Sequence, residues 1–274
     1  MSEIAKAILF GFVQGITEWL PISSTGHMIL LEEFLALQFS DTFVNTFFVV
    51  IQGGSILAVV LLFFKRLWPF GRGKDAREKR ETWALWFKII VAAIPAAVIG
   101  ILCEEQIDRY LFRSQVVAVA LVLYGVLFIL LESGHRKPKI TRLKDLDYRT
   151  ALMIGFFQVL SMVPGTSRSG STILGAVLIG CSRTVASEFS FVLAIPVMAG
   201  ASLLKLVKTS FGFGAMEWTV LLVGCLTSFL VSMVAIRFLL SYVRRHDFKA
   251  FGWYRVVLGA VVLAYFWYTG HTLA

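Results

Sequence analysis

The sequence predicts an all-α polytopic membrane protein, a single integral membrane domain over residues 1–274. The chain is 58% hydrophobic and only 16% charged, with a mean hydropathy of +0.79; soluble domains are roughly 45–50% apolar. Six apolar runs are long enough to cross a bilayer, and two further apolar segments are broken by a polar centre. Because these two segments resemble each other, we expect six transmembrane helices and two re-entrant helical hairpins in an inverted-topology repeat.

The first hairpin is predicted at residues 4–37, where the polar centre Pro21-Ile-Ser-Ser-Thr-Gly-His27 separates two apolar arms. Polar or irregular backbone at membrane depth is tolerated only inside protein or along a wet cavity, which favours a re-entrant hairpin. No small-residue cleavage site follows the first arm, so we expect it to remain in the mature protein. The first three predicted transmembrane helices then follow at residues 43–64, 83–103 and 114–132.

The second hairpin is predicted at residues 150–181, around Pro164-Gly-Thr-Ser-Arg-Ser-Gly-Ser-Thr172. Its sequence repeats the first: Gly155-Phe-Phe-Gln158 matches Gly11-Phe-Val-Gln14, and Pro164-x-Thr-Ser matches Pro21-x-Ser-Ser. Three more transmembrane helices are predicted at 186–206, 218–240 and 252–270. The repeats therefore span approximately 1–135 and 150–274, and the odd number of helices in each half inverts the second relative to the first.

The charge pattern predicts the orientation. The net charge of +9 is concentrated in the segments 65–82, 135–149 and 244–249, whereas the intervening loop carries Glu104, Glu105 and Asp108. Basic loops of membrane proteins lie in the cytoplasm, and this distribution gives no reason to expect nucleic-acid binding. Both termini are then outside, the hairpins open in opposite directions, and their tips meet near the midplane.

The sequences of the two hairpin tips predict a phosphate-binding site. Half-helices beginning at Ser23–Gly26 and at Ser169–Thr172 present free backbone N–H groups and positive dipole ends. Two such ends facing each other suit a ligand with two phosphates. The predicted substrate-binding residues are Gln14, Ser23, Thr25, Gly26, Ser167, Ser169, Gly170, Ser171 and Thr172.

Charged side chains at the tips are candidates for catalysis. Arg168 can bind phosphate oxygens through two N–H groups, and the alternative is a structural ion pair with Glu18 or Glu188. Gln14 and Glu18 share a helix face, where Glu18 can act as a base or help to bind Mg²⁺ or Ca²⁺. Its alternative role is a hydrogen bond to the tip loop.

A serine and a histidine lie one turn apart. Ser24 and His27 are spaced i,i+3, so the imidazole can activate the hydroxyl or protonate a leaving oxygen. The sequence permits attack by Ser24, which we favour, or by a water molecule that His27 and Glu18 position.

Over essentially its whole length the sequence resembles the bacterial undecaprenyl-diphosphate phosphatase family associated with bacitracin resistance. Gln14-x-x-x-Glu18 with Pro21–His27 is similar to the family's first motif, and Pro164–Gly170 to its second. The resemblance implies an inner-membrane enzyme that opens to the periplasm, removes the terminal phosphate of undecaprenyl pyrophosphate and recycles the cell-wall lipid carrier. It also implies a divalent cation and functional roles for the predicted catalytic residues Glu18, Ser24, His27 and Arg168.

One position departs from the family pattern, because many members carry Glu where this chain has Gln14, which offers a carbonyl oxygen but no charge. A second hypothesis is a secondary transporter or flippase for anionic lipid, which shares inverted repeats and broken helices but does not require the Ser/His/Glu/Arg cluster. Another lipid phosphatase superfamily is disfavoured because its Lys-x6-Arg-Pro and His-x3-Asp elements are not found. The oligomeric state is open, with a homodimer as one candidate.

Overall fold

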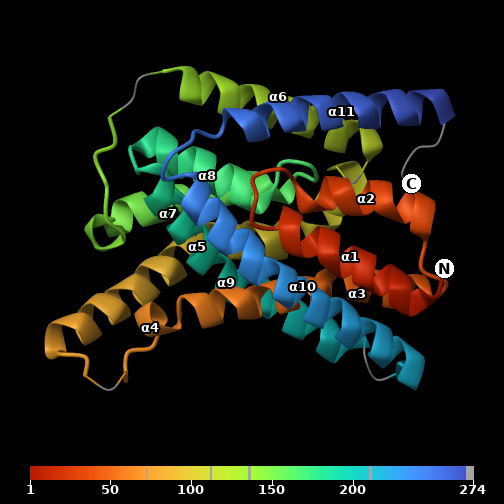
Figure 1. The fold of residues 1–274 in the computed structure, drawn as a ribbon, viewed down its shortest axis with the longest axis horizontal. Helices are drawn as coiled ribbons and strands as arrows, with labels where there is room; N and C mark the ends of the chain where they lie inside the picture. Colours follow the sequence, from red (N-terminus) through yellow and green to blue (C-terminus); the bar gives the residue numbers. More distant parts are fainter. Residues whose placement is uncertain (72, 112, 135–136, 210–211, 270–274) are drawn as a thin grey trace.

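The chain folds into helices throughout the part that the structure describes (Figure 1). This computed structural model describes residues 1–71, 73–111, 113–134, 137–209 and 212–269, with only the backbone described at 104, 105, 108, 109 and 114. The helices are α1 (Glu3–Thr17), α2 (Ser24–Leu35), α3 (Asp41–Leu62), α4 (Phe64–Leu67), α5 (Ala76–Leu111), α6 (Ser114–Ser133), η1 (Leu143–Asp145), α7 (Tyr148–Val159), η2 (Leu160–Met162), α8 (Arg168–Ile179), α9 (Arg183–Thr209), α10 (Ala215–Tyr242) and α11 (Lys249–Thr269). Within these described ranges, one isolated β-bridge joins Ile140 and Cys181.

Six helices among the described residues are long and apolar enough to cross a membrane: α3, α5, α6, α9, α10 and α11. This confirms the six predicted runs. The helices extend beyond the predicted runs at several boundaries. The largest differences are in α5, which begins at Ala76 instead of residue 83 and continues through residues 104–108, which we expected to form a loop. The helices α9, α10 and α11 each begin three residues before the predicted start. An apolar run marks only the part of a helix that suits the interior of a bilayer. The helix itself can extend beyond that run for as long as its backbone hydrogen bonds continue.

Capping side chains set several helix starts. Ser40 Oγ accepts a hydrogen bond from the Phe43 N–H at 3.3 Å at the start of α3, and Asp147 Oδ1 accepts one from the Thr150 N–H at 2.7 Å at the start of α7. Such caps satisfy N–H groups that the helix leaves without an acceptor. Hydrogen bonds from the side chain and backbone of Thr150 also lower the pKa of the Asp147 carboxyl.

Pairs of short helices, α1 with α2 and α7 with α8, lie where the two hairpins were predicted, and their re-entrant placement in a membrane stays a prediction. The free ends of α1 and α2 point to one end of the molecule, and those of α7 and α8 to the other (Figure 1). The basic segments lie together at the end of the molecule to which the free ends of α7 and α8 point; they are residues 65–82, 137–149 and 244–249. This arrangement agrees with the predicted repeat, while the inversion of the halves in a membrane stays a prediction; His135, Arg136 and Arg72 lie outside the described residues.

The two repeated glycines make equivalent close contacts. A Cβ on Gly11 of α1 would lie 2.5 Å from the Gly224 carbonyl oxygen of α10, and one on Gly155 of α7 would lie 2.3 Å from the Ala92 carbonyl oxygen of α5. Any larger side chain would push these helices apart. The shared motif therefore brings the first arm of each hairpin against one long helix.

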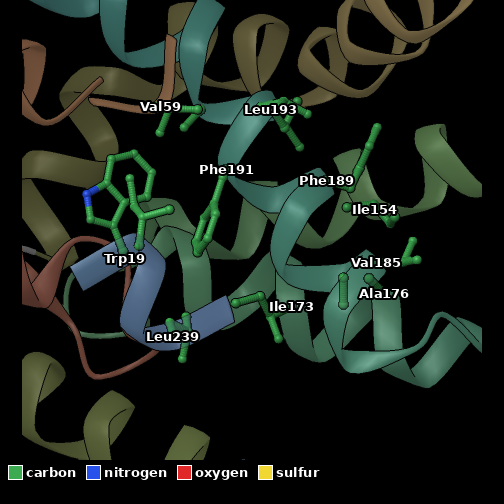
Figure 2. Packing of buried hydrophobic residues seen from close by; sticks show 14 of the residues in the cluster. Trp19, Val59, Ile154, Ile173, Ala176, Val185, Phe189, Phe191, Leu193 and Leu239 are labelled. Carbon is green, nitrogen blue, oxygen red and sulfur yellow. The ribbon is translucent and has the colours of Figure 1, made fainter. Parts of the chain in front are cut away.

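The main apolar core lies behind the hairpin tips (Figure 2). Trp19, in the turn after α1, is fully buried, and its ring meets the Phe191 ring of α9 edge-on with centroids 5.2 Å apart. Aromatic pairs in this geometry add about 0.5–1.5 kcal/mol to the effect of burial. Because Trp19 directly follows Glu18, this packing holds the first tip at a defined depth in the protein.

Candidate active site

The two tips have the same backbone construction. Ser23 and Ser167 adopt positive φ values of 74° and 71°, and each caps the following helix by accepting a hydrogen bond from the N–H of Gly26 or Gly170. Positive φ in a residue other than glycine costs on the order of 1–3 kcal/mol. Residues held in this way concentrate at functional sites, where the surrounding structure stabilises the strained conformation.

This construction corrects the predicted alignment of the tips. Matching the prolines aligned Ser24 with Ser167, and placed the start of the second half-helix at Ser169. In the structure Ser167 corresponds to Ser23, and α8 begins at Arg168. The second tip has one more residue between its proline and its capping serine, so Arg168 is the counterpart of Ser24 as the first residue of its helix.

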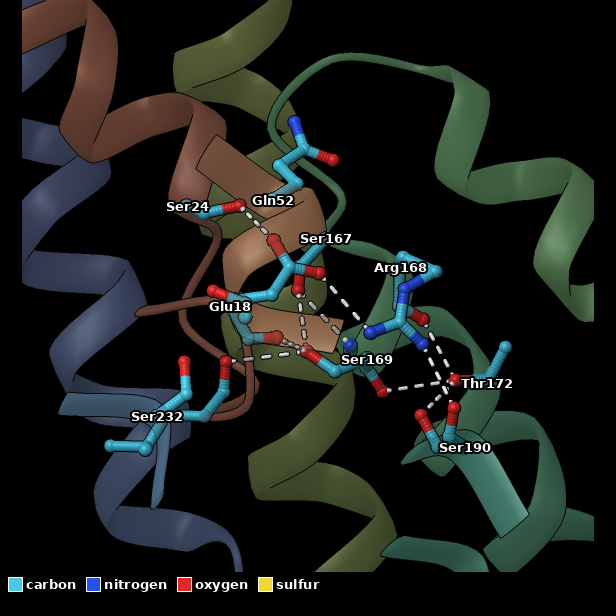
Figure 3. Close-up of polar contacts among 12 residues, drawn as sticks. Glu18, Ser24, Gln52, Ser167, Arg168, Ser169, Thr172, Ser190 and Ser232 are labelled. Atoms are coloured by element: carbon cyan, nitrogen blue, oxygen red, sulfur yellow. Dashed lines mark hydrogen bonds and ion pairs between the residues drawn. The ribbon is translucent and has the colours of Figure 1, made fainter. Parts of the chain in front are cut away.

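The carboxylate of Glu18 joins the two tips (Figure 3). It is only 5% exposed and accepts three hydrogen bonds: from Arg168 Nη2 to Oε1 at 3.1 Å, from Ser24 Oγ to Oε2 at 3.0 Å, and from Gln14 Nε2 to Oε2 at 2.9 Å. An anion thus lies at the start of both half-helices. Dipole and free N–H groups at a helix start favour negative charge there.

Arg168 forms the structural ion pair that was the alternative to phosphate binding. Besides Glu18, its Nη1 donates to the Ser190 carbonyl at 2.9 Å, and its guanidinium lies 5.7 Å from the centre of the Trp19 ring. Its buried Nε has no acceptor among the described residues. Glu188, the other predicted partner, binds Arg66 at 2.7 Å instead. Arg168 is therefore oriented by protein contacts and retains an unused donor.

His27 does not contact Ser24 through a hydrogen bond in the described structure. Its Nδ1 donates to the Ser23 carbonyl at 2.7 Å, because a carbonyl can only accept, and its Nε2 lies 2.6 Å from the hydroxyl of Tyr254 on α11. The two rings are also stacked, with centroids 5.6 Å apart. In this arrangement Glu18, rather than His27, accepts the hydrogen bond of the Ser24 hydroxyl.

Three predicted substrate-binding hydroxyls are fully buried against the protein. Ser169 Oγ lies 3.0 Å from the Glu18 carbonyl oxygen, Ser171 Oγ 3.1 Å from the Tyr124 hydroxyl, and Thr172 Oγ1 2.8 Å from the Arg168 carbonyl oxygen. Of the three, Ser169 joins the two tips, Ser171 binds α6, and Thr172 binds within α8 and to α9. Substrate cannot reach these hydroxyls without displacing those contacts. Their role as substrate ligands stays a prediction, and helix periodicity alone does not reveal that this face of α8 packs against neighbouring elements.

The other predicted substrate-binding groups lie at the tips. Ser23 Oγ and Ser167 Oγ serve as helix caps, and Gly26 and Gly170 provide the N–H groups that they bind. Thr25, in the first turn of α2, is only half-buried. The accessible first turn of α2, with Ser24 and Thr25, is therefore the better place for a phosphate than the buried first turn of α8.

The residues at the site form only part of a site for a divalent cation. Among the described residues, no group of three or more His, Cys, Asp or Glu side chains is placed to hold a metal ion. The hydrogen bonds of the two tips involve one carboxylate, that of Glu18. Gln14 turns its amide nitrogen, and not its carbonyl oxygen, toward this carboxylate. Mg²⁺ commonly uses one or two carboxylates plus substrate phosphates and water. The donor set fits a cation only if phosphate oxygens complete it.

Comparison with known proteins decides the family. A family model described as bacitracin resistance protein BacA matches residues 7–261, which include both tips. The chain belongs to this family.

Relatives in the BacA family match at almost full length. Undecaprenyl-diphosphatase 1 of Clostridioides difficile (strain 630) is 58% identical over 266 residues, 97% of each chain. Undecaprenyl-diphosphatase of Acetivibrio thermocellus is 53% identical over 268 residues, 97% of this chain and 98% of the relative. A third, undecaprenyl-diphosphatase of Enterococcus faecalis, is 53% identical over 265 residues, 95% of this chain and 96% of the relative.

In this BacA family member, two residues of α11 lie at the tips although the sequence reasoning did not select them. Tyr254 reaches His27, and Arg255 is fully buried with its guanidinium against both tips. A signal for Arg255 was available, because an ionisable residue within an apolar run is a functional hypothesis by default. No comparable signal marks Tyr254, since tyrosine is common near the ends of transmembrane helices.

Proposed function

We propose that this protein hydrolyses the terminal phosphate of undecaprenyl pyrophosphate to give undecaprenyl phosphate and inorganic phosphate. The full-length relatives named undecaprenyl-diphosphatase support the substrate class. The observation that carries the chemistry is the Glu18 carboxylate between a serine hydroxyl and an arginine guanidinium, each at the start of a half-helix. A nucleophile, a base and a cation are thereby brought within hydrogen-bond distance in a buried site.

Ser24 is the proposed nucleophile. Its Oγ attacks the terminal phosphorus while its proton passes to Glu18, to which the hydroxyl already donates. The bond from the terminal phosphorus to the bridging oxygen breaks, and undecaprenyl phosphate leaves with that oxygen. A water oxygen then attacks the phosphorus of the phosphoserine, and the bond from phosphorus to Ser24 Oγ breaks. Ser24 regains its proton from Glu18, and inorganic phosphate leaves as H₂PO₄⁻ with the oxygen and both protons of that water. The hydrogen bond from Ser24 to Glu18 supports Glu18 in place of His27 as the proton acceptor in this proposal.

Arg168 is proposed to stabilise negative charge on the transferring phosphoryl group. A guanidinium fixed by two protein contacts is already oriented before substrate binds, which lowers the cost of arranging it in the transition state. His27 lies at the less buried edge of the site with both ring nitrogens hydrogen-bonded, and it would exchange the contact of Nε2 with Tyr254 for one with a phosphate oxygen when substrate binds. A divalent cation held by Glu18, Gln14 and the substrate phosphates would neutralise further charge.

The site is proposed to open to the periplasm from the bacterial inner membrane. The basic segments gather at the end of the molecule opposite the free ends of α1 and α2 (Figure 1). Positive loops favour the cytoplasm, so the end that the first hairpin faces would be periplasmic. The half-buried Thr25 of α2 and the exposed Tyr254 of α11 lie beside the site. This location would suit recycling of a lipid carrier for the cell wall.

The direct test is phosphate release from C55 prenyl pyrophosphate by purified protein in detergent, with Mg²⁺, with Ca²⁺ and with chelator. We expect release that depends on the cation and disappears in Ser24→Ala. No release by the wild-type protein under any of these conditions would overturn the proposal and favour a lipid transporter. A homodimer stays a prediction.

A further inference from the structure

Arg255 has an unusual environment for a charged side chain. It lies on α11, its side chain is 0% exposed, and the ion pairs of the described residues give it no carboxylate partner. Its donors instead meet backbone carbonyl groups. Nη1 lies 3.2 Å from the Pro21 oxygen, and Nη2 lies 2.8 Å from that of Gly165 and 3.0 Å from that of Thr166.

These acceptors belong to both hairpin tips. Pro21 is in the first tip, two residues before Ser23, and Thr166 is in the second, directly before Ser167. The two serines are the residues other than glycine that hold positive φ among the described residues. One guanidinium thus binds the backbone within two residues before each strained cap. Its planar, fixed array of donors can hold three carbonyls at once, which a lysine ammonium on a flexible chain cannot reproduce.

The surroundings of Arg255 tie it closely to the second half-helix. A Cβ added to Gly170 would lie 3.1 Å from Arg255 Nη1, so the guanidinium packs directly against the first turn of α8. The guanidinium also lies 5.4 Å from the centre of the Tyr124 ring on α6, and the Tyr124 hydroxyl accepts from Ser171 Oγ. Movement of either tip would leave a buried cation short of acceptors, which is costly inside a protein.

We propose that Arg255 is a positioning residue that fixes the two tips relative to each other. It holds Ser24 and Arg168 within reach of the same Glu18 carboxylate and does not itself touch the substrate. The role in turnover rests on the function proposed above. The role in tip geometry does not, since it follows from the carbonyl contacts alone.

The test compares Arg255→Lys with Arg237→Lys, the same change at an exposed arginine of α10. Turnover of C55 prenyl pyrophosphate and hydrogen exchange of peptides covering residues 18–27 and 164–172 are measured on purified proteins in detergent. We expect Arg255→Lys to lower kcat about 10²-fold, since a misplacement of about 1 Å at a reacting group can cost that much. Exchange should rise in the two tip peptides and stay unchanged in the long helices, and Arg237→Lys should behave as wild type.

A milder variant covers the case in which Arg255→Lys does not fold. Tyr124→Leu leaves the arginine in place but removes the ring beneath it, and we expect about threefold to tenfold lower kcat with faster exchange confined to the tips. Wild-type exchange at the tips in the folded variants, or exchange that rises equally in every helix, would overturn the positioning role. An inactive wild-type protein would refute the proposed function, while the exchange measurements would still decide the role of Arg255.

Discussion

Replacement of Glu18 by glutamine is the most informative single change at the site. The substitution keeps the size of the side chain, removes its negative charge and replaces one acceptor oxygen by an NH₂ group. Arg168, Ser24 and Gln14 all donate to this carboxylate, at 3.1, 3.0 and 2.9 Å. Glutamine cannot accept all three hydrogen bonds, and it cannot take a proton from Ser24. We therefore expect loss of turnover together with a measurable loss of stability.

The expected magnitudes follow from burial and chemistry. The Glu18 and Arg168 side chains are only 6% and 11% exposed, and breaking a buried ion pair costs about 3–5 kcal/mol. Because the glutamine carbonyl can still accept one hydrogen bond from Arg168, we expect the free energy of unfolding to fall by about 3 kcal/mol. A general base contributes about 10²–10⁴ in rate, and Arg168 would be misoriented as well. Turnover should therefore fall at least about 10³-fold.

The assay is phosphate release over a titration of Mg²⁺ and Ca²⁺, with thermal unfolding measured on the same preparation. Glu81→Gln is the matched control, because Glu81 pairs with Arg77 at 3.2 Å on the surface. Exposed pairs contribute about 0–1 kcal/mol, so this variant should keep both turnover and stability.

Two results would refute the reasoning about Glu18. Retention of more than about a tenth of wild-type turnover would remove Glu18 from the role of general base, given the rate contribution expected of one. Full recovery of Glu18→Gln at high cation concentration would show that Glu18 contributes cation affinity alone.

Three further predictions concern the other tip residues and the topology. Arg168→Lys should lower turnover about 10²-fold or more, because an ammonium cannot span the contacts of a guanidinium; turnover near wild type would reduce Arg168 to simple electrostatic attraction or structure. Ser24→Ala should fall to background in phosphate release while Ser23→Ala and Thr25→Ala retain measurable turnover, and a few per cent of activity in Ser24→Ala would favour attack by water. A cysteine added after Ala274 should react with an impermeant reagent in intact spheroplasts, because the basic loops predict periplasmic termini; absence of labelling there would contradict that topology.

The amino-acid sequence was sufficient to predict the fold class and to select candidate site residues that the structure brings together. In a bilayer every backbone polar group needs an internal partner, so a run of about 20 apolar residues implies a helix. The polar centres of the two broken segments are recognisable for the same reason, because irregular backbone at membrane depth must be buried in protein or line a wet cavity. Glu18, Ser24 and Arg168 could be selected because polar and charged side chains are costly to place inside apolar segments. Such residues are therefore rare there and mark candidate functional sites.

Which of those groups contact each other became visible in the folded chain alone. One extra residue in the second tip moves the start of α8 to Arg168, which brings that side chain to Glu18. Ser169 is also buried against the first tip. From the sequence we expected its hydroxyl to be free to bind phosphate. Positive φ at Ser23 and Ser167 sets both turns, and no helical periodicity encodes such a backbone. The contacts of Arg255 connect residues 89 to 234 positions apart in the chain, so they exist only when all the helices are packed.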